Sequence, residues 1–500
     1  MLKKLVSVSG FTLLSRITGF ARDALLAWTL GAGVLSDAFI VAFLFPNNFR
    51  NIFGEGTINP AFLPRYAALH AKGEHAAAAK FANDVFAWQM AAQVALLVLA
   101  TVFMPAIIHV LAPDWSGRQF DLTVSLARIT FPYLIMTLVA VQLSAMLNAI
   151  DRFWAGAFWS NLQNLAMIAT LLLWRWFPNA AYAAAWGVFA GGVAQLIFIV
   201  WAGARDGLWL KITRPRWSPE IAEFFKALGA VIIGAGSIVI SPFIDTLIAS
   251  YLPPGSRTAL YYADRINQLP LGVLGIALGT VLLPEMSSRL AKGDLAGAHA
   301  AQNRSAAMSL LLTLPFMVSF ILIPGIIMRA YLAHGAFNKA AAGLAAAALA
   351  AYGVGMPAQA MIRIVQSTFY ARHDTMTPVR ATLASVACNI GLKFVFVWGF
   401  GLGVAGIAMG TAAGAWINVA LLIWLGKSRD LLSIDRQFLQ ALPVSLLAAA
   451  TTGAGAWIGA NLLKAHGDIA ALAAAILGAG LGYGATLLLF RSRLPIRRMA

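Results

Sequence analysis

Long apolar stretches recur along almost the whole chain, and they constrain the fold more than any other feature. A helix needs about 20 mostly apolar residues to cross the roughly 30 Å hydrocarbon layer of a membrane. Stretches of this kind cover residues 5–31, 35–50, 83–111, 122–147, 157–177, 181–203, 222–252, 259–284, 303–326, 340–370, 378–399, 403–426, 437–461 and 468–490. The sequence therefore predicts an all-α polytopic membrane protein with about 14 transmembrane helices.

The amino-acid composition excludes most other classes of protein. Hydrophobic residues make up 60% of the 500 residues and charged residues only 11%, whereas about 25% of the residues of a soluble protein are charged. So few polar side chains cannot cover a soluble enzyme of this size. The lone cysteine, Cys388, excludes a disulfide scaffold. The apolar runs are also much longer than the strands of a membrane β-barrel.

The basic residues are distributed unevenly between the two predicted sides of the membrane. With the N-terminus inside, 24 Lys and Arg fall on the cytoplasmic side and six on the other. This asymmetry follows the positive-inside rule and predicts that both termini are cytoplasmic. We attribute most of the net charge of +17 to orientation and to attraction to anionic bilayer lipids, and we expect no nucleic-acid partner. The remaining six basic residues lie inside predicted spans and away from the span ends: Arg16, Arg22, Arg128, Arg265, Arg363 and Lys393.

The two halves of the chain resemble each other. Residues 23–33 (DALLAWTLGAG) align with residues 245–255 (DTLIASYLPPG), and the segment from Leu63 to Glu74 aligns with that from Leu283 to Asp294 at nearly the same offset. Six helices separate the aligned elements, so the repeats are parallel, as in transporters that rock about a central substrate site. We predict an N-terminal lobe at 1–215, a C-terminal lobe at 216–430, and two additional helices at 431–500.

A cluster of charged residues lies in the first two predicted spans, and a smaller one lies in the second half of the chain. It contains Arg16, Arg22, Asp23, Asp37 and Arg50, and Asp264 with Arg265 lie in the eighth span. One interpretation is that buried Arg–Asp pairs hold helices together. The other is a cationic cavity for an anionic substrate, since arginine suits bidentate contacts with phosphate or pyrophosphate.

A second group of buried polar residues combines Asp245 in the seventh span with Asn389 and Lys393 in the eleventh. Asn389 and Lys393 are four residues apart and share one face of a helix. A buried ion pair explains this group, and a coupling site for a proton or a cation is the alternative. A lysine in the position of the cation argues against sodium binding.

No motif for catalysis, for a cofactor or for a metal site is present. The seven histidines show no metal-ligand spacing, and neither a Walker loop nor a nucleophile elbow occurs. We therefore expect a protein that is not an enzyme and that uses no cofactor. A membrane glycosyltransferase or polymerase would need paired carboxylates outside the membrane, where Asp114 and Asp121 are the nearest candidates. A multidrug exporter would need an acidic or aromatic cavity, and an inert scaffold would not need buried arginines.

Motifs in both halves resemble those of the MurJ (MviN) lipid II flippases, within the multidrug/oligosaccharidyl-lipid/polysaccharide exporter superfamily. The resemblance covers essentially the whole chain. It rests on residues 15–23 (SRITGFARD), 31–33 (GAG), 36–39 (SDAF), 46–47 (PN), Arg50, 53–56 (FGEG), 61–64 (AFLP), 261–265 (YYADR), 269–270 (LP), 272–275 (GVLG) and 369–372 (FYAR).

The resemblance implies translocation of lipid II, an undecaprenyl-pyrophosphate-linked peptidoglycan precursor, from the cytoplasmic to the periplasmic leaflet by alternating access. It places substrate-binding roles on Arg16, Arg22, Arg50, Arg265 and Asp37. Asp23, Glu55 and Asp264 would support or gate that cavity. The last two helices would form a groove for the lipid tail. A flippase for another polyprenyl-pyrophosphate-linked oligosaccharide is the nearest alternative.

Two positions depart from the family pattern. Asn51 stands where many members have a second arginine, and Gln268 stands where some have an acid, so the role of that acid does not transfer to this chain. The resemblance is compatible with a monomer and with contacts to the peptidoglycan synthesis machinery.

Overall fold

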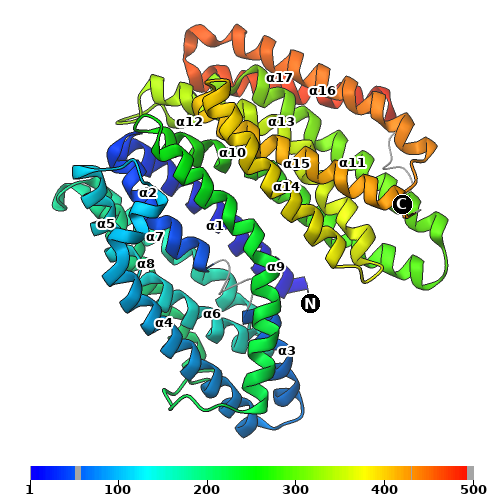
Figure 1. Ribbon diagram of the computed structural model, residues 1–500. Coiled ribbons are helices and arrows are strands. Elements are labelled where there is room, and N and C mark those ends of the chain that lie inside the picture. Colours follow the sequence, from blue (N-terminus) through cyan, green and yellow to red (C-terminus); the bar gives the residue numbers. More distant parts are fainter. Residues whose placement is uncertain (1, 51–57, 430, 492–500) are drawn as a thin grey trace. The chain divides into compact units, whose positions relative to one another are not determined.

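A computed structural model of the chain describes residues 2–50, 58–429 and 431–491. Every regular element in these ranges is a helix, which confirms the all-α fold class (Figure 1). The helices of the first half are α1 (Leu2–Leu30), α2 (Val34–Arg50), α3 (Ile58–Ala71), α4 (His75–Leu111), α5 (Gly117–Thr130), α6 (Tyr133–Ala149), α7 (Phe153–Leu172), α8 (Ala180–Arg205) and α9 (Pro219–Ser250).

The helices of the second half follow in the same style. They are α10 (Ser256–Ala291), α11 (Leu295–Leu322), α12 (Pro324–Leu332), α13 (Lys339–Tyr370), α14 (Met376–Phe394), α15 (Gly403–Lys427), α16 (Arg436–Leu462) and α17 (Asp468–Leu489). A short π-helix, Val395–Gly399, extends α14.

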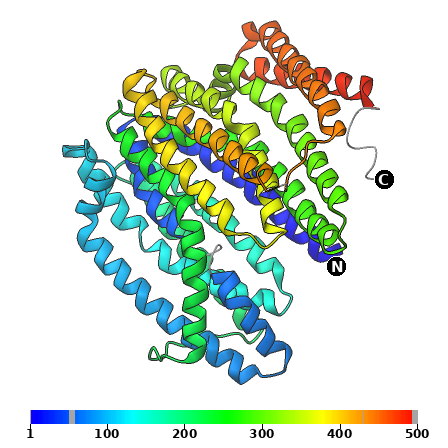
Figure 2. The same cartoon turned by 45° about the vertical axis from the view of Figure 1, so that its right-hand side comes forward.

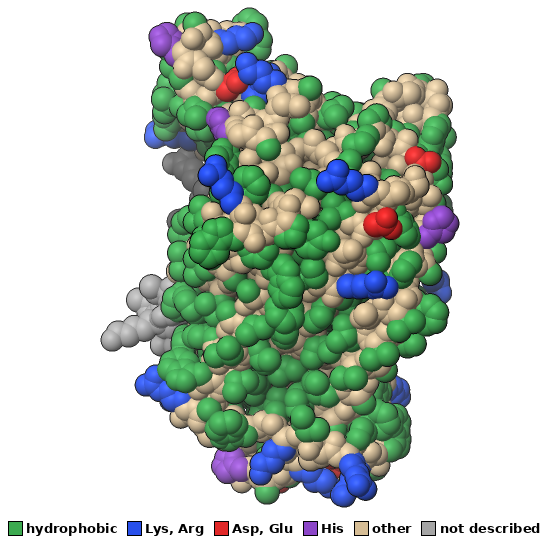
Figure 3. All heavy atoms as spheres, turned by 90° about the vertical axis from the view of Figure 1, so that its left-hand side faces the viewer, with side chains coloured by type: hydrophobic (Ala, Val, Ile, Leu, Met, Phe, Trp, Pro, Cys, Tyr) green, Lys and Arg blue, Asp and Glu red, His purple; other side chains and the backbone are tan. Residues whose placement is uncertain are grey.

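Nine helical segments of the described chain are long and apolar enough to cross a membrane, which makes this a multi-pass membrane protein. The number fourteen stays a prediction, since α2 has only 17 residues and α7 carries three amide side chains. The face shown in Figure 3 is hydrophobic over most of its middle, and Lys and Arg side chains gather at its lower end.

The predicted span over residues 122–147 is confirmed as one apolar segment, and it is broken at Pro132. The structure has two helices there, because α5 ends at Thr130 and α6 begins at Tyr133, with Pro132 at the break. Proline has no N–H group to donate and its ring obstructs the preceding turn. The two helices together still form one apolar segment, Gly117–Ala149.

Side-chain caps explain where several helices begin. A capping oxygen accepts a backbone N–H that the first turn of a helix cannot satisfy by itself. For α9 the cap is the Ser218 hydroxyl, and Pro219 follows as the first helical residue, a position in which the missing N–H of proline costs nothing. The other capping side chains belong to Asn179 of α8, Asp294 of α11, Asn338 of α13 and Asp435 of α16.

The backbone contacts divide the chain into two compact units. The first contains residues 1–255 together with 335–337, and the second contains 256–334 and 338–500. Residues 335–337 belong with the first unit because the N–H of Ala336 donates to the carbonyl of Trp28. A side chain on Gly335 would collide with Trp28. The predicted lobes at 1–215, 216–430 and 431–500 stay a prediction.

Within the first unit, α7 packs against α1 and α8, and α2 packs against α5. Within the second unit, α13 packs against α10, α11 and α15, and α11 packs against α16. The last two helices, α16 and α17, lie along each other in both views (Figures 1 and 2). Their backbones touch at Gly455 and Gly478, where an added Cβ on either residue would collide with the backbone of the other helix.

One turn occurs in both halves with the same backbone hydrogen bonds. In the first half, Gly73 (φ +78°) follows α3, and the N–H of Glu74 donates to the carbonyl of Leu69. In the second half, Gly293 (φ +73°) follows α10, and the N–H of Asp294 donates to the carbonyl of Arg289. The positive φ explains the glycine at both places. The turn occupies the positions that the sequence repeat aligns.

Candidate functional site

The charged residues of α1 are brought together with α7 inside the first unit. Arg22 and Asp23 are only 7% and 4% exposed. Oδ1 of Asp23 accepts hydrogen bonds from Nε (2.9 Å) and Nη2 (2.6 Å) of Arg22. On the other edge of the guanidinium, Nη1 donates to Oδ1 of Asn164 on α7 (2.9 Å). The arrangement contains the Arg–Asp pair expected of buried charges and also holds the guanidinium plane in a defined direction.

Helix α7 supplies further amides to the same interface. Nδ2 of Asn164 donates to the carbonyl of Ser15 and to the hydroxyl of Thr18, both at 3.1 Å. One turn earlier, Nδ2 of Asn161 donates to the carbonyl of Phe11 (3.4 Å), and Oδ1 of Asn161 lies 3.4 Å from the hydroxyl oxygen of Thr18. Hydrogen bonds of this kind hold helices together in a membrane, where no water competes for them.

The other three predicted substrate-binding arginines are more open than Arg22. Arg16 is exposed on α1. Arg50 is the last residue of α2 and donates to Oδ1 of Asn47 (3.4 Å). Arg265 is exposed on α10 in the second unit, with its guanidinium 5.6 Å from the ring centre of Tyr261. The tyrosine ring favours the cation without cancelling its charge.

Asp37 has a backbone partner. It is 2% exposed in the first turn of α2, and its Oδ2 accepts the N–H of Gly255 at 2.6 Å. Gly255 has φ +95° and lies against the backbone of Ala32, so a residue with a side chain would be strained there. Asp37 therefore ties the start of α2 to the end of the α9–α10 connection, which belongs to the same unit.

The remaining supporting residues are placed in part. Asp264 on α10 accepts a short hydrogen bond from Nε2 of Gln268, one turn later. This contact uses the amide that stands where some family members have an acid. Glu55 and Asn51 lie outside the described residues.

Asn389 and Lys393 lie on the face of α14 that meets α15. Lys393 is 0% exposed and Asn389 is 7% exposed. A Cβ on Gly410 would collide with the side chain of Lys393, and one on Gly414 would come within 2.7 Å of Cβ of Asn389. Glycines four residues apart on α15 therefore make room for a buried lysine and a buried amide. Asp245 lies half-buried on α9, in the first unit.

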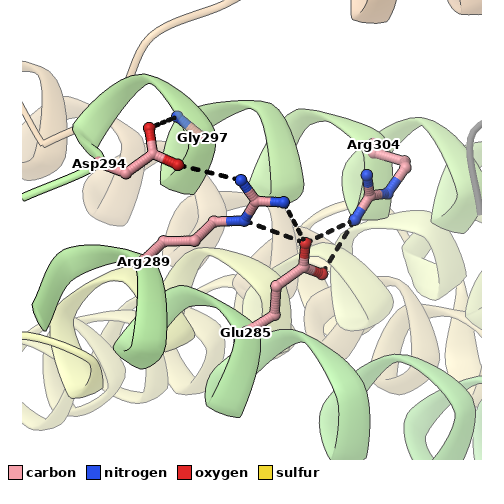
Figure 4. A network of polar contacts seen from close by, with 5 residues as sticks. All are labelled: Glu285, Arg289, Asp294, Gly297 and Arg304. Carbon is pink, nitrogen blue, oxygen red and sulfur yellow. Dashed lines mark hydrogen bonds and ion pairs between the residues drawn. The ribbon is translucent and has the colours of Figure 1, made fainter. Parts of the chain in front are cut away.

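A second charged network follows Pro284 at the end of α10 (Figure 4). We call Glu285, Arg289, Asp294 and Arg304 the Glu285 network. Both carboxylate oxygens of Glu285 accept from Nη2 of Arg304 at 2.9 Å, and Arg289 donates to Glu285 and to Asp294. Burial alone would raise the pKa of Glu285, but hydrogen bonds from Arg304 and Arg289 lower it below the ordinary value. The pKa of Asp294 is also lowered, mainly by the hydrogen bond from the N–H of Gly297 and to a smaller extent by the hydrogen bond from Arg289.

Two residues of these sites carry no clear signal in the sequence. Asn164 is recognisable only as one of three amides in an apolar helix, for which the sequence predicts interhelical hydrogen bonds. Asn161 and Asn164 make such hydrogen bonds with α1. Gly255 is recognisable only as the end of the repeated segment. Among the described residues, no group of three or more His, Cys, Asp or Glu could hold a metal ion.

Comparison with known proteins places the chain in a family. The model of the family described as "Lipid II flippase MurJ" matches residues 26–477. The chain belongs to the MurJ family. A "Probable lipid II flippase MurJ" of Rhizobium tropici is 38% identical over 84% of this chain and 80% of its own length. Another, of Rhizobium meliloti (strain 1021), is 36% identical over 93% and 89%.

Solved structures show the same fold. A "Lipid II flippase MurJ, inward closed conformation" has a TM-score of 0.79 at 23% identity, covering 97% of this chain and 99% of its own. An inward-facing multidrug resistance MATE family transporter of the MOP superfamily has a TM-score of 0.68 at 14% identity, covering 82% and 94%. The expectation of a MurJ-type transporter fold from the sequence motifs is thereby confirmed.

Proposed function

We propose that this protein moves lipid II from the cytoplasmic to the periplasmic leaflet of a bacterial inner membrane. The match of the MurJ family model over residues 26–477 carries this proposal. The pyrophosphate and sugar head of such a substrate cannot cross hydrocarbon unaided, whereas its polyprenyl tail is stable in lipid. A flippase therefore has to shelter the head and leave the tail outside.

Arg16, Arg22, Arg50 and Arg265 are the proposed ligands of the pyrophosphate during transport by alternating access. Arginine binds phosphate oxygens through two parallel hydrogen bonds. The exposure of Arg16 and Arg265 and the fixed guanidinium of Arg22 support this role. Asp37, Asp23, Asp264 and Glu55 would hold these arginines in place or compete for them when the head leaves.

The last two helices would guide the lipid tail. The outward residues of α17 are large and apolar, with Ile476, Leu477 and Leu481 each more than 60% exposed. The close backbone contact between α16 and α17 would keep this surface continuous. Anionic bilayer lipids would meet the basic cytoplasmic ends of the helices, and both termini would be cytoplasmic.

The energy source is proposed to be electrical. Resetting an empty cavity lined by arginines moves positive charge through a potential worth about 2.3 kcal/mol per charge per 100 mV. Buried Lys393, beside Asn389, would provide a fixed internal charge for this step without a sodium ion. Transport that is unchanged after collapse of the membrane potential would contradict this step.

We propose that the protein is a transporter and not an enzyme, that it acts as a monomer, and that the peptidoglycan synthesis machinery is a potential partner. The test is the leaflet accessibility of lipid II in cells whose own flippase is replaced by this chain. We expect outer-leaflet lipid II to be restored and to be lost with Arg16→Ala or Arg265→Ala. Failure to restore it, with the protein present in the membrane, would contradict the function. Restored export of another polyprenyl-pyrophosphate oligosaccharide alone would transfer it to that substrate.

A further inference from the structure

Asn164 joins Arg22 on α1 to a second helix, α7. It touches Arg22 through Oδ1 and α1 through Nδ2. Its helix, α7, contains none of the charged residues assigned to the substrate. Helix α7 therefore reaches the proposed substrate site only indirectly, through the contact of Asn164 with Arg22.

The hydrogen bonds fix which end of the Asn164 amide faces Arg22. The hydroxyl proton of Thr18 is directed to the carbonyl of Leu14 (2.9 Å), so Thr18 receives its bond from Asn164. The carbonyl of Ser15 can only accept. Both partners therefore require the NH₂ group of Asn164, and the oxygen is left to face Nη1 of Arg22.

Contacts on two edges prevent the guanidinium of Arg22 from turning. Asp23 accepts from Nε and Nη2, and Asn164 accepts from Nη1. An arginine that binds an anion through parallel hydrogen bonds needs its plane held in the right direction. Asn164 supplies this restraint as a neutral group. A second carboxylate in its place would give the cluster a net negative charge and would repel a pyrophosphate.

We propose that Asn164 is a positioning residue for lipid II binding, acting by orienting the guanidinium of Arg22 against Asp23. This inference rests on the proposed function, in which Arg22 binds the pyrophosphate. Helix α7 would then take part in substrate recognition through Asn164, in addition to packing against α1.

The test is a double-mutant cycle on the full-length protein in lipid nanodiscs, with the Kd for lipid II as the measurement. Asn164→Leu keeps the size of the side chain and removes the acceptor of a charged hydrogen bond, so we expect the Kd to rise about tenfold. Arg22→Lys keeps the charge beside Asp23 but has no planar fork to orient. Adding Asn164→Leu to Arg22→Lys should change the Kd less than twofold.

Asn161→Leu is the matched control. It removes a similar set of hydrogen bonds between α7 and α1 but none to Arg22. We expect its melting temperature to fall about as much as that of Asn164→Leu, with the Kd unchanged. If Asn164→Leu does not fold, Asn164→Ser replaces it with the same expectation.

Two outcomes would overturn the inference alone. One is an equal rise in Kd for Asn164→Leu with and without Arg22→Lys, or for Asn161→Leu, since a purely structural role is additive. The other is an unchanged Kd for Asn164→Leu while Arg22→Lys weakens binding. An unchanged Kd for Arg22→Lys would instead contradict the proposed role of Arg22 itself.

Discussion

The two copies of the repeated turn have the same backbone but opposite charges beside it. The residue after the Leu-Pro pair is Arg65 in the first half and Glu285 in the second. Arg65 reaches Glu223 (2.6 Å) and Glu220 (3.6 Å) on α9, and Glu223 is 73% exposed. Glu285 reaches Arg304 on α11 and Arg289 on its own helix, and the Glu285 and Arg304 side chains are 25% and 19% exposed.

The difference shows that a duplicated backbone keeps its turn while its ionic contacts diverge. The turn depends on a glycine with positive φ and on backbone hydrogen bonds, which both halves retain. The ion pairs depend instead on which charged side chains of a neighbouring helix lie close to the turn. The first copy fastens α3 to α9, at an exposed site. The second copy joins α10 to α11 across the turn itself, at a more buried site.

The largest expected effect in this comparison comes from Glu285→Ala. It leaves Arg304 and Arg289 without their shared acceptor in a partly buried position. Allowing for solvent screening, we expect a loss of about 1–2 kcal/mol in the free energy of unfolding. Chemical or thermal unfolding of the purified protein in detergent measures it. A loss no greater than that of Arg65→Ala would remove the contrast between the halves.

The next effect separates the two caps of the turn. Asp294 accepts the N–H of Gly297 as the cap of α11, whereas the equivalent Glu74 makes no capping hydrogen bond with its side chain. Asp294→Ala should lower the melting temperature by about 1–3 °C. Glu74→Ala is its matched control and should leave it unchanged. Equal changes for both variants would mean that the cap contributes nothing.

Acidification should weaken the second copy of the turn. The folded-state pKa values of Glu285 and Asp294 are lowered from unfolded values of about 4.3 and 3.9. Their contribution is present above those unfolded values and is lost as the pH falls through the lower, folded ones. The melting temperature should therefore fall below about pH 4.5, less steeply in Glu285→Gln. An identical pH profile for that variant would exclude Glu285 as the cause.

The smallest effect is expected for Arg65→Ala, within about 0.5 kcal/mol, because exposed ion pairs contribute little. Its guanidinium also lies 5.5 Å from the ring centre of Phe81, so Arg65→Met keeps the packing and isolates the charge. We expect high salt to abolish the difference between Arg65→Met and the unchanged protein. A loss above 1 kcal/mol for Arg65→Met would show that the link to α9 matters as much as the Glu285 network.

The sequence predicted the class of fold and the repeat because both follow from local patterns. Apolar length indicates spanning helices, and Gly73 and Gly293 mark the turns. The break at Pro132 was less predictable, because proline also occurs inside helices here, as Pro242 and Pro357 show. Partners across helices could not be predicted. Nothing in the spacing of Arg22 and Asn164 indicates that they meet, because their contact depends on how α7 packs on α1.

The glycines of α15 have a consequence for how the protein enters the membrane. Lys393 is fully buried against Gly410 in the folded protein, but α14 precedes α15 in the chain and emerges first during synthesis. A lysine within a lone spanning helix disfavours the release of that helix into lipid. Contact with the glycine face of α15 offers that lysine an alternative to lipid. The arrangement favours insertion of α14 and α15 together, as a hairpin, during biosynthesis.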